Sequence, residues 1–451
     1  MQKYIFKNIS VVNEGKIMIT DVFIEKGRIA RIGNSLTIKE NVIEIQGEGK
    51  HLIPGIIDDQ VHFRDPGLTH KGDTYTESKA GVAGGVTSYM EMPNTIPNAL
   101  TQPLLENKYS NASQRSLSNY SYYMGVSNNN PEDVLRTNDK RKKVCGVKIF
   151  LGSSTGDMLV DNAKTINRIF SESELLIATH CEDEKIIREN YETLKQHKAK
   201  PDPSDHPVIR NEAACYSSSS AAIAMAKKYG SRLHILHIST AKEIELFDNK
   251  IPLLQKNITS EVCVHHLHFT ADDYEKLGYL IKCNPAIKSG DNKNALWKGL
   301  LDDHLDLIAT DHAPHTLQEK EPPYEHAHSG LPLVQHSLLL MLRYYKEGKI
   351  SLENLVRKMC HSVADCFKLE NRGYIREGYF ADLVIINLKN QSGVTKGNIL
   401  YKCGWSPLEG ETFPAQVTDT FVNGNRIYSM DPYGNIVWDE SSRGARLEFN
   451  R

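Results

Sequence analysis

Residues 56–64 read Ile-Ile-Asp-Asp-Gln-Val-His-Phe-Arg, so a run of strand length (56–61) leads directly into His62 and Arg64. Comparable apolar runs recur through residues 53–370, separated by longer segments that are compatible with helices. Near-continuous apolar runs that alternate with helices are typical of buried parallel strands. The runs are 56–61, 86–92, 120–126, 144–151, 175–178, 233–238, 258–264 and 305–309. Eight such runs predict an α/β fold, a (β/α)8 TIM-type barrel.

The two ends of the chain have a different pattern. Short segments there alternate polar and apolar side chains and flank turn signals such as Asn423-Gly424, which is typical of half-buried antiparallel strands. These segments are 4–9, 17–25, 28–32, 374–378, 381–386 and 420–428. We therefore expect residues 1–52 and 371–451 to form a small composite β-sandwich beside a barrel domain of residues 53–370.

Composition excludes several classes of function. The chain has 451 residues, and its 54 Lys and Arg nearly balance its 56 Asp and Glu, so no basic field exists to attract nucleic acid. No apolar run approaches the roughly 18 residues of a membrane span, and the first residues do not resemble a secretory signal. The eight cysteines have no paired spacing, which favours reduced thiols. We expect a cytoplasmic protein that acts on a small molecule.

Metal-capable side chains follow several of the apolar runs at their carboxyl ends. In a barrel these ends share one rim, where catalytic groups gather. Imidazole and carboxylate are usual ligands of a catalytic zinc ion, which keeps one position open for water. Any one such residue alone would more often be a capped or hydrogen-bonded core residue, but four at equivalent positions favour a metal site. The four are His62, His180, His237 and Asp311.

Lys148 lies inside the apolar run 144–151, where an ammonium group is costly unless it is paired or neutral. It could reach the rim or pair with a carboxylate such as Asp311. Alternatively, it could be carbamylated by carbon dioxide, which turns the cation into a carboxylate able to bridge two metal ions. Asp311 could pass a proton from water to a leaving nitrogen, or it could only cap a following helix.

Three further residues near the strand ends suit substrate recognition. Arg64 offers a planar fork that can bind a carboxylate in a bidentate manner, although a surface salt bridge with Asp65 is equally compatible with the sequence. Asn94 follows a proline and Asn284 precedes one. Both could supply amide donors at the rim, or both could simply form turns.

With these residues assembled, the sequence resembles the dihydroorotases of the amidohydrolase superfamily over nearly the whole chain. Residues 54–64 resemble the family's PG-x-x-D-x-H-x-H-x-R stretch, 92–95 its MPNT element, 283–285 its NPP element and 310–315 its TDHAPH element. The resemblance implies that zinc, as one or two ions, is held by His62, Lys148, His180, His237 and Asp311. It also implies that Asp311 is the proton shuttle and that substrate is gripped by Arg64, Asn94, Asn284 and His315.

The family reaction is the reversible cyclisation of N-carbamoyl-L-aspartate to dihydroorotate in pyrimidine biosynthesis, and the family also suggests a homodimer. One departure matters: Gln60 stands where the family has its first metal histidine, and an amide oxygen is a poorer zinc ligand. Asp58 or Asp59 could compensate. The rival hypotheses are a hydantoinase or allantoinase and a non-catalytic scaffold. His265, His266 and His268 could orient metal ligands or simply pack in the core, and His326 and His328 could belong to a loop that covers the site; packing is the preferred interpretation for both groups.

Overall fold

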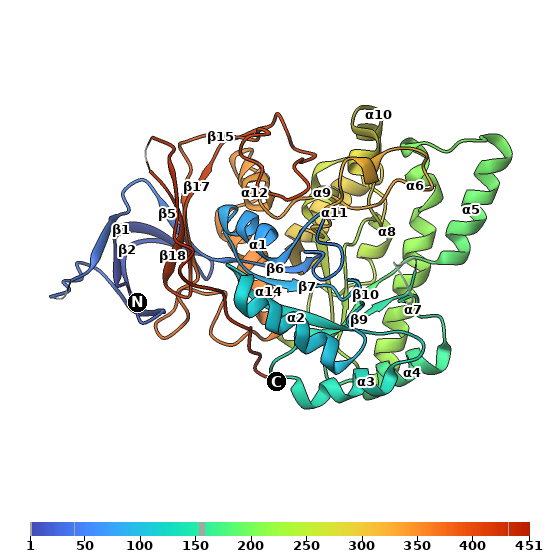
Figure 1. Cartoon of the computed structure of the whole chain (residues 1–451), viewed down its shortest axis with the longest axis horizontal. Coiled ribbons are helices and arrows are strands. Elements are labelled where there is room, and N and C mark those ends of the chain that lie inside the picture. Colours follow the sequence, from blue (N-terminus) through green and yellow to red (C-terminus); the bar gives the residue numbers. More distant parts are fainter. Residues whose placement is uncertain (1, 40, 153–157, 432) are drawn as a thin grey trace.

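The computed structural model describes residues 2–39, 41–152, 158–431 and 433–451. At its centre, eight parallel strands form one sheet in the order in which they occur in the chain (Figure 1). They are β6 (Ile56–Val61), β7 (Val86–Glu91), β8 (Asn119–Gly125), β9 (Gly146–Phe150), β10 (Ile177–His180), β11 (Leu233–Ile235), β12 (Ile258–Cys263) and β13 (Leu307–Ala309). Every one overlaps a predicted run, so the barrel prediction is confirmed.

The ring closes between its first and last strands. Val61 and His312 form a parallel bridge, and the backbone N–H of His62 donates to the carbonyl of His312 at 2.7 Å. Nearly all residues of the eight strands are buried, as expected for a parallel sheet that is covered on both faces. Polar side chains at the carboxyl ends of these strands are therefore gathered at one rim.

Helices surround the strands (Figure 1). They are α1 (Thr74–Ala83), α2 (Gln102–Arg115), α3 (Pro131–Leu135), α4 (Ala163–Glu172), α5 (Glu184–His197), α6 (His206–Ile209), α7 (Glu212–Tyr229), α8 (Ala241–Ile244), α9 (Val264–His268), α10 (Tyr274–Leu277), α11 (Gly290–Leu301), α12 (Ser337–Lys346), α13 (Leu352–Val356) and α14 (Ser362–Phe367). Among the helices of the described residues, none combines the length and the apolar character that crossing a bilayer demands.

Strands from both ends of the chain form a second sheet beside the barrel (Figure 1). It contains β1 (Tyr4–Asn13), β2 (Lys16–Glu25), β3 (Arg28–Gly33), β4 (Ile43–Gln46), β5 (His51–Pro54), β14 (Leu383–Asn387), β17 (Gln416–Val422), β18 (Asn425–Met430) and β19 (Ile436–Trp438), while β15 (Ser392–Gly393) and β16 (Thr412–Phe413) pair separately. The two ends meet where β5 pairs antiparallel with β14. The predicted pairing of terminal segments is therefore confirmed.

This terminal sheet curls so that its own apolar side chains meet. In the strand order, β5 and β14 separate β1 from β17, yet the ring of Phe421 on β17 lies 5.2 Å from the rings of both Tyr4 and Phe6 on β1. Strands in a flat sheet are about 4.8 Å apart, so side chains three strands apart would not touch. The curvature gives the unit a sandwich-like core of its own.

The prediction of a strand over residues 374–378 is wrong. Gly373 and Gly378 adopt positive φ values of 80° and 86°, a backbone conformation that interrupts an extended strand. The backbone N–H of Ile375 donates to the side chain of Asn13 at 3.1 Å instead of to a neighbouring strand. The segment therefore crosses from α14 to β14 as irregular structure.

A buried ion pair joins the terminal sheet to the barrel. Asp382 accepts hydrogen bonds from Arg372, from the backbone N–H of Asn423 at 2.8 Å, and from the side-chain amide of Asn119 on β8 at 3.2 Å. Asp382 and Arg372 are only 5% and 4% exposed. Because the pair is buried and satisfied, each charge depends on the other.

We expect Asp382→Ala to lower the free energy of unfolding by about 3–5 kcal/mol, because Arg372 would remain buried without a counter-charge. Urea denaturation followed by circular dichroism measures this loss. The double variant Arg372→Met/Asp382→Leu removes both charges and should lose much less. A double variant as unstable as the single one would contradict this account.

Candidate metal and substrate site

A cavity of about 270 Å³ lies at the carboxyl rim of the barrel strands. All nine candidate residues line it: His62, Arg64, Asn94, Lys148, His180, His237, Asn284, Asp311 and His315. These residues come from seven of the eight strands or from the segments that follow those strands. The barrel thus gathers groups that are far apart in the chain.

His180 and His237 face each other across the cavity. Nδ1 of His180 lies 3.0 Å from Nε2 of His237, and burial lowers the pKa of both imidazoles, so both are neutral and able to bind a metal. Oε2 of Glu182 lies 3.1 Å from Nε2 of His180. A carboxylate behind a histidine in this way fixes the ring and leaves the other nitrogen for a metal.

Lys148 points into the same cavity from the middle of β9. Its side chain is 1% exposed, and its ammonium nitrogen has no hydrogen-bond partner among the described residues. Nζ lies 4.3 Å from the centroid of the Phe150 ring. Burial lowers the pKa of Lys148 to about 7. The alternative of an ion pair with Asp311 is therefore not what the structure shows.

Asp311 and His62 form the opposite wall. Oδ1 of Asp311 lies 3.1 Å from Nε2 of His62, and Nδ1 of His62 lies 2.7 Å from Oδ1 of Asn94. Both ring nitrogens of His62 thus lie near oxygen atoms. A neutral imidazole can donate to only one of them, so the other nitrogen keeps a lone pair that a metal can bind. Asp311 is followed by irregular structure rather than by a helix, so it is not a helix cap.

Three of these residues adopt a left-handed backbone conformation. Arg64, His237 and Asp311 have φ values of 70°, 40° and 48°. Such conformations cost about 1–3 kcal/mol each for residues other than glycine, and they persist where surrounding structure enforces them. Their concentration at this rim is typical of a functional site.

Gln60 also lines the cavity. Its side-chain amide donates to Oδ1 of Asp311 at 3.2 Å. The two aspartates that could have compensated for it point elsewhere: Asp58 bonds to the backbone and hydroxyl of Thr310, and Asp59 lies 3.4 Å from His234. Neither aspartate lines the cavity.

A cationic cluster forms the far side of the cavity. Nη2 of Arg64 and Nζ of Lys71 each lie 3.0 Å from a ring nitrogen of His315, and both cations are buried. Among the described residues, no carboxylate forms a salt bridge with Arg64, because Asp65 pairs with Arg115 instead. The hypothesis of a surface salt bridge for Arg64 is therefore wrong. Its Nε donates to the carbonyl of Pro314 at 3.1 Å, so part of the fork is engaged within the protein while the guanidinium lies at the cavity.

Sequence reasoning missed Lys71 and the contribution of His328. Lys71 bridges His315 and Glu319 at 3.0 Å each, and the His328 ring stacks on His315 with centroids 4.8 Å apart. Ser329 and Gly330 also line the cavity. Nothing in the spacing of Lys71 or His328 marked them, because both lie in loops.

The remaining candidates also have defined places. Asn284 lies at the cavity, with Oδ1 3.1 Å from Nε2 of His206. His268 is 2.8 Å from the hydroxyl of Tyr344 and His326 is exposed, so neither of these two histidines lines the cavity.

These side chains fit a divalent cation. Lys148 Nζ is buried without a partner among the described residues, and at the same cavity Nδ1 of His180 and Nε2 of His237 converge to 3.0 Å. Unpaired buried polar atoms are costly, and a cation between these groups would satisfy them.

Comparison with known proteins agrees with this geometry. The family model described as "Amidohydrolase family" matches residues 51–427. A dihydroorotase of Methanosphaera stadtmanae is 30% identical over 96% of this chain and 97% of its own. A dihydroorotase of Lactobacillus delbrueckii subsp. bulgaricus is 31% identical over 94% and 98%.

Among solved structures, the L-hydantoinase (dihydropyrimidinase) of Arthrobacter aurescens superimposes with a TM-score of 0.90 at 26% identity, over 97% of this chain and 98% of its own. The D-hydantoinase of a Thermus species, at 21% identity and a TM-score of 0.86, shares the fold over 98% and 99% of the two chains. The chain therefore belongs to the amidohydrolase family and, by sequence, to its dihydroorotases.

Proposed function

We propose that this chain is a zinc-dependent dihydroorotase, which reversibly closes N-carbamoyl-L-aspartate to dihydroorotate in pyrimidine biosynthesis. The observation that carries the proposal is the combination of the facing pair His180–His237 with Arg64 in one cavity of about 270 Å³. The first group suits a metal that activates water, and the second suits a substrate carboxylate. Full-length likeness to dihydroorotases supports it.

Zinc would be held by His180, His237 and Lys148, with His62 and Asp311 on the facing wall. When bound, the ion would polarise the substrate carbonyl and lower the pKa of water, so that ring opening proceeds near neutral pH. Gln60 occupies the place of a family ligand with an amide that faces Asp311. We infer one firmly bound ion in this set, because an amide oxygen is a poorer zinc ligand than imidazole.

Asp311 would move the proton. In ring opening its carboxylate accepts a proton from the attacking water and delivers it to the ring nitrogen as the amide bond breaks. The side-chain amide of Gln60 donates to this carboxylate at the cavity wall. Cyclisation runs through the same steps in reverse.

Arg64 would bind the substrate carboxylate through its planar fork. Asn94, Asn284 and His315 would bind the rest of the substrate, and Lys71 adds a second positive charge beside His315. These groups orient the substrate rather than take part in the bond changes.

A hydantoinase is the alternative with a specific observation behind it, since the L-hydantoinase structure superimposes closely. Arg64 argues against a hydantoinase. It is buried and forms no salt bridge with a carboxylate among the described residues, and hydantoin carries no carboxylate that would need this cation. A non-catalytic scaffold is less compatible with the complete set His62, Lys148, His180, His237 and Asp311. The homodimer and the cytoplasmic location stay predictions.

We expect Asp311→Asn to reduce the rate of dihydroorotate ring opening by about 10²–10⁴-fold, because the amide cannot accept and return a proton. Loss of dihydroorotate absorbance measures the rate. The control Asp272→Asn changes an exposed carboxylate and should keep full activity. Near-normal turnover in Asp311→Asn would exclude the proton-transfer role.

We expect Arg64→Met to lower kcat/KM for dihydroorotate by about 10–150-fold, the equivalent of a lost charge-assisted hydrogen bond of about 1.5–3 kcal/mol. Any slow turnover of hydantoin should be little affected. Arg115→Met, on a partly exposed arginine, is the matched control. Equal losses on both substrates would contradict the carboxylate assignment.

We expect Lys148→Ala to lose bound zinc and activity, and short carboxylic acids such as propionate to restore part of both. The small side chain leaves room for an added carboxylate in place of a carbamylated lysine. Zinc content by mass spectrometry and turnover are the two measurements. Lys148→Met fills the space and should not respond, and rescue by ethylamine instead would show that the unmodified amine is the working group.

A further inference from the structure

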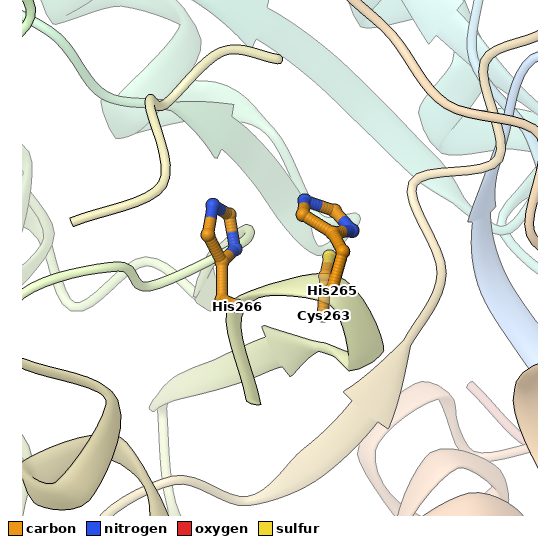
Figure 2. Close-up of side chains that lie close together, drawn as sticks. All are labelled: Cys263, His265 and His266. Carbon is orange, nitrogen blue, oxygen red and sulfur yellow. The ribbon is translucent and has the colours of Figure 1, made fainter. Parts of the chain in front are cut away.

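A second group of metal-binding side chains lies at the carboxyl end of β12. Cys263 ends that strand, and His265 and His266 lie on the short helix α9 that follows. One ligand atom from each of the three lies within 4.8 Å of the others. Figure 2 shows both imidazoles rising from the same side of the helix, with the sulfur of Cys263 close to the ring of His265.

The three side chains are buried, at 0%, 1% and 3% exposure for Cys263, His265 and His266. Neither ring nitrogen of His265 makes a well-formed hydrogen bond, although the backbone of Thr310 lies near the ring, and Nδ1 of His266 has no partner among the described residues. Leaving such a group unsatisfied costs about 1–3 kcal/mol. Three nitrogens without partners in one place favour a ligand that accepts their lone pairs.

The hydrogen bonding of His266 shows which of its nitrogens is available. Nε2 lies 3.1 Å from the carbonyl oxygen of Pro285, so Nε2 carries the proton and donates it. The lone pair of Nδ1 is then free. A histidine that binds a metal usually donates its other N–H to a carbonyl in this way, which fixes the tautomer and the orientation of the ring.

The surroundings favour a cation. Burial lowers the pKa of His265 to about 4 and that of His266 as well, so both rings are neutral and able to coordinate. Burial and nearby carboxylates, those of Glu261 and Asp311 first among them, raise the pKa of the Cys263 thiol. The carboxylate of Asp311 would stabilise a divalent ion, whose coordination deprotonates the thiol.

We propose that Cys263, His265 and His266 form a second zinc site, separate from the catalytic set. One thiolate and two imidazoles match the sulfur and nitrogen ligands that zinc prefers, whereas magnesium and calcium prefer oxygen. Binding releases the thiol proton. Oε1 of Gln60 lies 3.8 Å from the sulfur, so this site adjoins the position where the family's metal histidine is replaced.

Cobalt substitution tests the site without relying on activity. The catalytic set contains no sulfur, so a thiolate-to-cobalt charge-transfer absorption after Co²⁺ is added to metal-free protein reports only on a cysteine ligand. We expect this band in the wild-type protein and its loss in Cys263→Ser, together with a fall of about one bound ion per chain. His266→Gln should also remove that ion.

Cys181→Ser is the matched control, because Cys181 is also buried and lies near Lys148. It should keep the band, and circular dichroism should show that all variants are folded. A wild-type protein without the band, or a band that survives in Cys263→Ser, would overturn the proposal. Dihydroorotate turnover in the same wild-type sample separates this outcome from the proposed function: turnover without the band refutes only the second site, and the band without turnover refutes only the function.

Discussion

The site depends on how the ring of strands closes between β13 and β6. At this seam the carboxylate of Asp58 accepts hydrogen bonds from the backbone N–H and the hydroxyl of Thr310, at 3.2 and 2.6 Å. Thr310 immediately precedes Asp311, whose backbone is held in a left-handed conformation. The same seam carries the bond from His62 to the carbonyl of His312. Closing the barrel at this seam therefore also brings His62 and Asp311 into contact.

Burial inside the closed ring of strands also lowers the pKa of the basic side chains that line the cavity. Burial lowers the pKa of His62, His180 and His237 and brings that of Lys148 to about 7. Each of these groups would hold a proton less readily than in water. A cavity lined by neutral nitrogen bases and one aspartate offers electron pairs to a cation, which is what metal-assisted opening of a cyclic amide requires.

Much of this arrangement was predictable because the strand ends of a barrel obey a geometric rule. His62, His180, His237 and Asp311 stand at or just beyond strand ends, so apolar runs alone predicted that they meet. Lys71 and His328 were not predictable in this way, because loop residues reach the cavity through contacts that no periodicity encodes. The missed break at residues 374–378 has a similar cause: an alternating pattern predicted a strand, but the positive φ values of Gly373 and Gly378 decided the backbone.

The position of Gln60 suggests a role for His265 and His266, which the sequence alone assigned to packing. Gln60 presents an amide to the cavity and turns its N–H group toward Asp311. Its oxygen faces the sulfur of Cys263, and beyond that sulfur lie His265 and His266. Ligand types that favour zinc are thus scarcer on β6 and concentrated after β12, within the same rim. With both sets occupied, one ion would lie at the substrate. The other, bound by Cys263, His265 and His266, would stabilise the carboxyl end of β12.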